Sequence, residues 1–506
     1  MAPLRSRRRH ALLAVPAGLA LTASLALLPG ATASAAPQGG TPATKAAATD
    51  GPLLSYVVNA TADRATVARV KKAVTAAGGS VVTAYDRIGV VVAHSANPGF
   101  AQALRAVPGV QSAGATRTAP ITPAATTDFG PPEKVKPPVA NSLSAARSLA
   151  SGKEPLEGLQ WDLPAIKADE AAKVEPGSRK VTVGVIDTGV DDTHPDLAPN
   201  FSKSQSASCV SGKPDTSPGA WRPTDPAKDY HGTHVAGTIA AARNGIGVAG
   251  VAPNVRLAAI KVSQPRSSSF YAESVVCAFV FAADHGIAVT NNSYYVDPWM
   301  FNCADDPDQK AIADSIGRAT KYAESKGIVN VASAGNSNFD LAAKELTDTG
   351  SPNDTKPPRT RRIDPSVCLD VPAQLPGVVT VSATGVKSQK SFYSNYGLGQ
   401  IDVAAPGGDN LQIPDLPAKD GRILSTLPGG DYGYLQGTSM AGPHVAGVAA
   451  LLKTTHPRST PQEIQWILKA QAHNPGCGGV TGCAGTAHVN GYFGYGIVDA
   501  LAAVQD

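Results

Sequence analysis

The sequence predicts an α/β fold built on a mostly parallel sheet. From Gln160 onward, apolar runs typical of buried strands (VTVGVI, LAAIKV, GIAVTN, GIVNVAS and GVVTVSA) alternate with segments of helical pattern at residues 272–285, 309–325 and 460–470. Alternation of this kind places helices on both faces of a parallel sheet. The roughly 350 residues after Gln160 suffice for one large core.

A smaller α+β domain is predicted before this sheet, with its core at residues 53–118. The order is a strand (LLSYVVNA), a helix over 63–77 stopped by Gly78-Gly79, two strands (SVVTAY and IGVVVAHS), a helix over 100–107 and a strand from Val110. The order β-α-β-β-α-β is typical of the ferredoxin-like fold.

The N-terminal segment has the pattern of a secretory signal peptide. Four arginines between residues 5 and 9 precede an apolar stretch over 11–28, and Ala33-Ser34-Ala35 supplies a small-residue cleavage site. A membrane anchor is the alternative, but the stretch is short and ends at Pro29-Gly30. We therefore expect 1–35 to be a signal peptide and the mature chain to be secreted and free of the membrane.

A second irregular region separates the two predicted domains. Residues 119–156 contain seven prolines among alanine, serine and threonine, which is a linker composition. This division gives a signal peptide at 1–35, a small domain within 36–118, a linker at 119–156 and the large domain at 157–506.

Charge and cysteine content fit an exported protein. Without residues 1–35 the chain has 40 basic and 40 acidic residues, which argues against nucleic acid or an anionic membrane as partner. The six cysteines are an even number, as expected for disulfides in an exported chain, and none forms a CxxC pair. Proximity favours pairing Cys477 with Cys483, whereas Cys277 could equally be a buried free thiol.

Three motifs bring together the residue types needed for nucleophilic catalysis. GTSMAGPHVAG places Ser439 at the first turn of a predicted buried helix, VTVGVIDTGV places Asp187 at the end of a buried strand, and HGTHVAG places His231 at a helix start. A serine hydroxyl attacks carbonyls only with a base and an oriented acid beside it. The chain order Asp, His, Ser is that of the subtilisin arrangement.

These three motifs resemble those of the subtilisin-like serine peptidases (subtilases), and the likeness covers residues 157–505. The resemblance implies that Asp187, His231 and Ser439 are catalytic, that His234 is structural, and that the sheet belongs to a three-layer subtilisin-like fold. It also implies that the small domain is a propeptide that assists folding, inhibits the enzyme and is cut away in or just before the linker. The expected protein is a monomeric, self-processing endopeptidase that acts on polypeptides.

The resemblance assigns further residues to the substrate cleft. Asn336, in VASAGNSN, matches the asparagine of the oxyanion hole. Where relatives have Ser-Leu-Gly-Gly along the substrate-binding edge, this chain has Ser293, Tyr294, Tyr295 and Val296. The added bulk predicts a narrower specificity than that of a degradative relative. An expanded segment over 338–371 follows Asn336, and its length is more often elaboration than function.

A structural calcium site is also implied by the resemblance. The residues that match the family's ligands are the Asp196 carboxylate, the Asn244 side chain and the backbone carbonyls of Ala242, Ile246 and Val248. Glu157 is a weak candidate for an amino-terminal ligand, and Arg243 beside the loop counts against the site. An ordinary glycine loop is the alternative.

Two classes of function remain open on the sequence. The first is an active secreted endopeptidase made as an inhibited zymogen. The second is a subtilisin-fold protein without turnover that serves in binding or adhesion, for which only the two tyrosines give support. The complete set of catalytic residue types favours the first.

Overall fold

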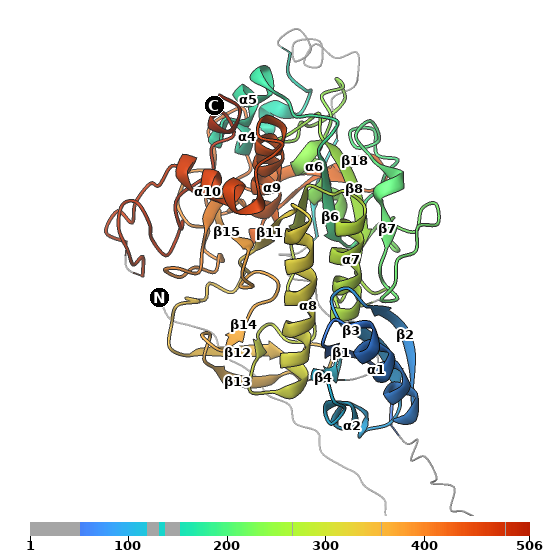
Figure 1. Ribbon diagram of the computed structural model, residues 1–506. Coiled ribbons are helices and arrows are strands. Elements are labelled where there is room, and N and C mark those ends of the chain that lie inside the picture. The colour runs from blue at the N-terminus through green and yellow to red at the C-terminus, as the bar shows by residue number, and fades with distance from the viewer. Residues whose placement is uncertain are drawn as a thin grey trace, which may run out of the picture. The chain divides into compact units, whose positions relative to one another are not determined.

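The computed structural model describes residues 51–118, 131–136 and 152–505, apart from 266, 356 and 481 (Figure 1). The predicted signal peptide at 1–35 lies outside these ranges, as does most of the predicted linker.

A seven-stranded sheet forms the centre of the large domain, in the order β16-β15-β11-β9-β6-β8-β7. Every neighbouring pair in this sheet is parallel, which confirms the predicted sheet type. The strands are β6 (Thr182–Asp187), β7 (Ala207–Ser208), β8 (Arg256–Lys261), β9 (Val289–Asn292), β11 (Val329–Ser333), β15 (Val378–Thr384) and β16 (Val403–Pro406).

Helices cover both faces of this sheet, as the alternating pattern predicts. Helices α6 (His231–Ala240) and α9 (Thr438–Thr455) pack on one face, and α7 (Ala272–Asp284) and α8 (Pro307–Ser325) on the other. Along β6 the side chains of Val183 and Val185 join the core beneath α6 and α9, whereas Ile186 joins the core beneath α7. Opposite faces of one strand therefore serve two cores, and the result is a three-layer fold.

Local sequence signals explain where several helices begin. The Asp306 carboxylate accepts hydrogen bonds from the amides of Asp308 and Gln309, and Pro307 occupies the first turn of α8. A capping box between Thr460 and Glu463 starts α10 (Pro461–Gln471). The remaining helices are α4 (Asp162–Ala165), α5 (Ala168–Val174), α11 (Ala502–Gln505) and the 3-10 turns η1 (Glu157–Leu159) and η2 (Lys203–Gln205). No helix in the described ranges has the length and apolar character needed to span a membrane.

The first described segment has the predicted β-α-β-β-α-β order. Its elements are β1 (Leu54–Ala60), α1 (Arg64–Ala76), β2 (Gly79–Tyr85), β3 (Val90–Ser95), α2 (Phe100–Arg105) and β4 (Val110–Ala115). The strands form an antiparallel sheet in the order β2-β3-β1-β4. We call residues 51–118 the N-terminal segment; its strands β1 and β4 pack against α8, with β1 also touching α7.

Two described parts of the predicted linker, residues 131–136 and 152–156, contact the large domain. Strand β5 (Glu133–Val135) pairs antiparallel with β18 (Asp431–Leu435), which itself pairs with β17 (Ile423–Leu427). Leu156, the residue before the predicted boundary at 157, is buried against residues of the large domain. A three-residue edge strand is held by backbone hydrogen bonds and needs no apolar pattern, which explains why composition did not reveal it.

Two small hairpin-like sheets and three disulfides complete the described structure. Strands β12 (Leu346–Ser351) and β13 (Arg359–Ile363) pair within the expanded segment, and β10 (Asn302–Cys303) pairs with β14 (Cys368–Leu369). The disulfide Cys477–Cys483 confirms the predicted pairing. The free thiol considered for Cys277 is wrong, because this residue bonds to Cys209; Cys303 bonds to Cys368. These partners lie 68 and 65 residues apart, too far for proximity in sequence to predict them.

Candidate active site

Asp187 and His231 meet at the carboxyl edge of the large sheet. Asp187 is the last residue of β6, which has β8 on one side and β9 on the other. Such a point, where the strand order reverses, is where open α/β sheets bind ligands. The His231 Nδ1 donates to Asp187 Oδ1 at 2.8 Å and lies 3.0 Å from Oδ2, and both side chains are almost fully buried. The carboxylate therefore fixes the orientation and tautomer of the imidazole.

The start of α6 is shaped by small residues that let His231 approach β6. A β-carbon at position 232 would lie 2.4 Å from the Gly189 carbonyl oxygen, so only glycine fits there. His234, one turn into the helix, is fully buried and its Nε2 donates to the Ile423 and Gly433 carbonyls, each at 3.1 Å. Burial lowers the pKa of His234 to about 3, so its ring stays neutral and its position fits a packing role.

Ser439 lies in the first turn of α9, two residues after Gly437, whose φ of 154° falls in the region that favours glycine. Two hydrogen bonds tie this turn to the end of β9. The Ser293 hydroxyl donates to the Ser439 carbonyl at 2.9 Å, and the Ser439 hydroxyl donates to the Ser293 carbonyl at 3.3 Å. Helix α9 also packs against α6, which begins at His231. The amide groups at the start of α9 favour negative charge beside the Ser439 hydroxyl.

The Asn336 side chain is oriented toward the same turn. Its Oδ1 accepts hydrogen bonds from the Thr438 amide and hydroxyl, both at 2.8 Å. With Oδ1 held there, the Nδ2 group faces Gly437, where a β-carbon would lie 3.4 Å from it. The carboxamide is therefore placed to present N–H groups beside Ser439. Thr438, which orients it, has a role that the sequence motif did not reveal.

The two tyrosines of the expected substrate edge point into the protein. Tyr294 is 3% exposed, its ring stacks on Phe270 at 4.8 Å, and its hydroxyl donates to Asn292 Oδ1. The Tyr295 hydroxyl accepts a hydrogen bond from Asn353 Nδ2, which belongs to the expanded segment. Ser293 contacts Ser439, whereas the two tyrosine side chains contact Phe270, Asn292 and Asn353.

The expanded segment over 338–371 is packed onto this edge. Within it, Asp348 is buried and forms an ion pair with Arg361. The Asn353 amide donates to the Pro298 carbonyl, and Asn353 Nδ2 also donates to Asp297. Burial raises the pKa of Asp297 to about 7. The segment therefore builds part of the wall that continues from the substrate edge.

The expected calcium residues lie around one loop. The Asp196 Oδ2 accepts from the Val248 amide at 3.0 Å, and Asn244 Oδ1 accepts from the Ile246 amide at 3.1 Å. Asp196 Oδ1 is buried and has no hydrogen-bond partner among the described residues. Ala242 donates its amide to the Asp196 carbonyl. No group of three or more His, Cys, Asp or Glu side chains that would hold a metal occurs in the described ranges.

Glu157 is not placed as a ligand. Both of its carboxylate oxygens accept from the Arg243 guanidinium, each at 2.8 Å. The acidic side chain that meets the loop is Glu154, whose Oε2 accepts from the Gly245 and Ile246 amides. Burial raises the pKa values of both Glu154 and Asp196, and the nearby Asp196 charge adds to the effect on Glu154.

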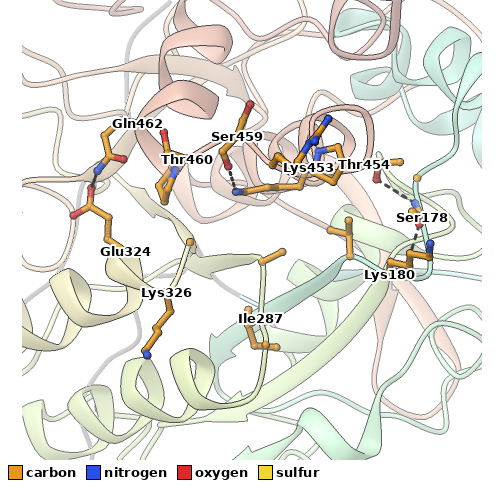
Figure 2. A pocket seen from close by; sticks show the side chains of 18 of the residues that line it. Ser178, Lys180, Ile287, Glu324, Lys326, Lys453, Thr454, Ser459, Thr460 and Gln462 are labelled. Atoms are coloured by element: carbon orange, nitrogen blue, oxygen red, sulfur yellow. Dashed lines mark hydrogen bonds between the residues drawn. The ribbon is translucent and has the colours of Figure 1, made fainter. Parts of the chain in front are cut away.

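A separate pocket of about 1260 Å³ opens at the opposite end of the sheet's strands from Asp187 (Figure 2). Ser178 and Lys180 precede β6, Ile287 precedes β9, and Lys326 precedes β11, so this pocket lies at the amino ends of the parallel strands. Its lining has no residue in common with the Asp187, His231 and Ser439 cluster.

Sequence reasoning missed four charged residues near these sites: Arg117, Glu154, Glu273 and Asp354. Each is brought into place by contacts between positions far apart in the chain, such as the Arg117–Glu273 ion pair, whose members are 156 positions apart. Nothing in the local sequence around these residues distinguishes them from ordinary surface charges.

Comparisons with known proteins agree with this geometry. The model of the subtilase family (Peptidase S8) matches residues 178–496. Subtilisin E from Bacillus subtilis (strain 168) is 31% identical over 353 residues, covering 69% of this chain and 72% of the relative. M-protease from Shouchella clausii (strain KSM-K16) is 32% identical over 349 residues, covering 69% and 70%.

Solved structures give the same result. The epidermin leader peptide processing serine protease of Staphylococcus aureus has a TM-score of 0.65 and 25% identity, covering 89% of this chain and 98% of its own. Fervidolysin from Fervidobacterium pennivorans, a keratinolytic enzyme, has a TM-score of 0.61 and 25% identity, covering 90% of this chain and 61% of its own. The chain belongs to the subtilase family and is a subtilisin-like serine endopeptidase that acts on polypeptides.

Proposed function

We propose that Asp187, His231 and Ser439 form the catalytic triad of this peptidase, with Asn336 as a donor of the oxyanion hole. The observation that carries the proposal is the buried Asp187–His231 hydrogen bond at the carboxyl edge of the sheet, together with Ser439 at the start of the helix that packs on α6. These are the positions and residue types that an acyl-transfer site requires.

In this mechanism His231 removes the proton from the Ser439 hydroxyl as its oxygen attacks the scissile carbonyl. The same imidazole then gives the proton to the leaving amine, and a water molecule repeats the cycle on the acyl-enzyme. Asp187 stabilises the imidazolium that forms. The Ser439 amide and the Asn336 carboxamide donate to the developing oxyanion, a contribution that is about 2.7–4 kcal/mol per donor in related sites.

We further propose that the chain is secreted as a precursor that the N-terminal segment inhibits until it is removed, and that the mature enzyme is a monomer. The N-terminal segment packs on α8. Its last described residues, Arg117 and Thr118, contact Glu273 of α7 and Asp354 of the expanded segment. Strand β5 and Leu156 are bound into the large domain. A cut that releases the segment and keeps these contacts falls between residues 118 and 133.

Covalent labelling tests the nucleophile. Wild type incubated with a serine-directed fluorophosphonate should carry the label on Ser439, as located by mass spectrometry, and Ser439→Ala should stay unlabelled and uncut. The exposed-serine variant Ser325→Ala should label like wild type. Absence of label on the wild-type Ser439 would instead favour the binding or adhesion protein without turnover.

A time course tests the precursor. Peptide hydrolysis should appear only as the N-terminal segment is released, with the new N-terminus located between 118 and 133 by mass spectrometry. Full activity of the intact chain would contradict the inhibitory role.

We also infer that the loop over 242–248 binds a calcium ion through Asp196 and, as second carboxylate, Glu154 rather than Glu157. The buried Asp196 oxygen without a partner and the raised pKa values of the two carboxyls support it, because a divalent cation would offset their desolvation. Such an ion would supply stability and no chemistry. Chelator should lower the thermal midpoint of Ser439→Ala, and Asp196→Ala should remove that response. A midpoint that is unchanged by chelator would exclude the site.

A further inference from the structure

The N-terminal segment ends in an arginine that is bound like a ligand. The Arg117 side chain is 11% exposed and forms an ion pair with Glu273, which is 4% exposed. Its guanidinium lies over the ring of Tyr271, 4.1 Å from the centroid. A carboxylate and an aromatic face are the two partners that a guanidinium prefers.

The next residue is also held through polar contacts. The Thr118 amide donates to Asp354 Oδ2 at 2.8 Å, and its hydroxyl donates to Asp354 Oδ1 at 2.5 Å. Asp354 is fully buried and belongs to the expanded segment over 338–371. One carboxylate thus accepts hydrogen bonds from both a backbone amide and a small hydroxyl side chain.

These contacts lie on the continuation of the substrate edge. Ser293 contacts Ser439, and four residues later Asp297 forms a backbone bridge with Tyr271. A peptide strand advances roughly 3.3 Å per residue, so a substrate lying along 293–297 reaches Tyr271 about four to six residues from the bond at Ser439. Because the proposed cut lies between residues 118 and 133, Arg117 lies on the amino side of the cleaved bond.

Release of the N-terminal segment leaves this site without its cation. Glu273 then faces the space that the guanidinium has left, and its Oε2 already has no hydrogen-bond partner among the described residues. A buried carboxylate that has lost its partner is unfavourable until another cation or water reaches it. A substrate arginine supplies the same guanidinium and has the freedom to bind both oxygens.

We infer that Glu273, Tyr271 and Asp354 form a subsite of the mature enzyme that selects polypeptides with an arginine several residues before the cleaved bond. A small hydroxyl residue directly after the arginine completes the preferred sequence. The inference rests on the proposed catalytic function and gives it a substrate class. It also gives the expanded segment a part in recognition, through Asp354.

Matched peptides test the subsite. Quenched fluorescent peptides carry either arginine or its neutral isostere citrulline at one position, two to eight residues before the bond, and kcat/KM is measured with mature wild-type enzyme. At one position we expect arginine to be preferred by at least about tenfold, the size expected of a charged hydrogen bond in a buried site. Equal rates at every position would overturn the inference.

Two variants assign the preference to its residues. Glu273→Gln should bring the arginine-to-citrulline ratio close to one, because the charged hydrogen bonds to the guanidinium are lost. The exposed residue Glu345 gives a control with the same charge change, and Glu345→Gln should keep the wild-type ratio. A ratio that survives in Glu273→Gln would also overturn the inference.

The failure of catalysis and the failure of the subsite are separable. Fluorophosphonate titration of Ser439 gives the active fraction of every preparation. A wild type that is neither labelled nor hydrolytic contradicts the proposed function. A wild type that is labelled and hydrolytic but indifferent to arginine contradicts only the subsite, and this holds even if Glu273→Gln fails to fold.

Discussion

The protein has two arginine–glutamate pairs of similar burial, one within the large domain and one between the large domain and the N-terminal segment. Glu157 is 3% exposed and Glu273 is 4% exposed, and each accepts from an arginine. The partner of Glu157 is Arg243, in the loop after α6, whereas the partner of Glu273 is Arg117 in the N-terminal segment. The first pair lasts as long as the domain is folded. The second lasts only while the N-terminal segment is bound, and release of that segment would leave Glu273 without Arg117. We call the first the fixed pair and the second the vacatable pair.

Breaking the fixed pair should give the largest loss of stability. Glu157→Ala removes a bidentate carboxylate that also accepts from the Glu154 amide, and leaves Arg243 partly buried without its partner. We expect the free energy of unfolding to fall by about 3–5 kcal/mol. Denaturant titration in the Ser439→Ala background, where self-digestion is excluded, measures it.

The double variant Glu157→Met/Arg243→Met is the matched control. It removes both charges and keeps much of the volume, so most of the loss should be recovered. A double variant as unstable as Glu157→Ala would show that packing, rather than an unpaired charge, causes the loss.

Asp297 shows what burial does to a carboxylate whose hydrogen-bond partners are neutral. It accepts from the Phe270 amide and Asn353, and burial raises its pKa from 3.8 to about 7. Between these values the folded protein holds a proton that the unfolded chain releases. Stability therefore falls as pH rises from about 4 to about 7 and is level above, by linkage.

As the pH rises across that range, the parent should lose roughly 2–4 kcal/mol of stability that the Asp297→Asn variant keeps, because asparagine does not titrate. Denaturant titrations from pH 4 to 8 in the Ser439→Ala background measure the change with pH, which is independent of any constant cost of the substitution. A difference that does not vary with pH would mean that Asp297 stays ionised in the folded protein.

Breaking the vacatable pair should have a smaller effect. In the uncut Ser439→Ala precursor, Arg117→Met leaves Glu273 unpaired, but local release of the segment lets the carboxylate reach water. The cost is therefore limited by the free energy that holds the segment, and we expect about 1–3 kcal/mol. Hydrogen exchange of the β4 amides measures it as faster opening. Unchanged β4 protection would show that Arg117 adds nothing to docking.

Local patterns predicted the fold because its features are local, and they placed the three residues of the proposed triad in the elements that hold them. The run ending at Asp187 is buried on both faces and therefore continuously apolar, and the starts of α6 and α9 are set by their own glycines. Glu154 was missed because it and Glu157 lie three residues apart, and the local sequence does not show which of them reaches the loop over 242–248. Strand β5 and the Arg117 site were missed because backbone pairing and distant ion pairs have no signature in a short window.

The smallest effect is expected at Arg362 of β13, and its neighbour Arg361 provides a comparison between an exposed ion pair and a buried one. Successive side chains of a strand point to opposite faces. Arg361 accordingly pairs with the fully buried Asp348 and lies over the Trp299 ring, whereas Arg362 pairs with Glu345 at 3.5 Å, with both side chains more than half exposed. Arg362→Ala should change the free energy of unfolding by less than about 0.5 kcal/mol, because water screens an exposed pair. Arg361→Ala should cost several times more, since it strands a buried carboxylate. Denaturant titration of both variants in the Ser439→Ala background decides the matter: equal losses would mean that forming a pair, and not burying it, determines what an arginine contributes in this protein.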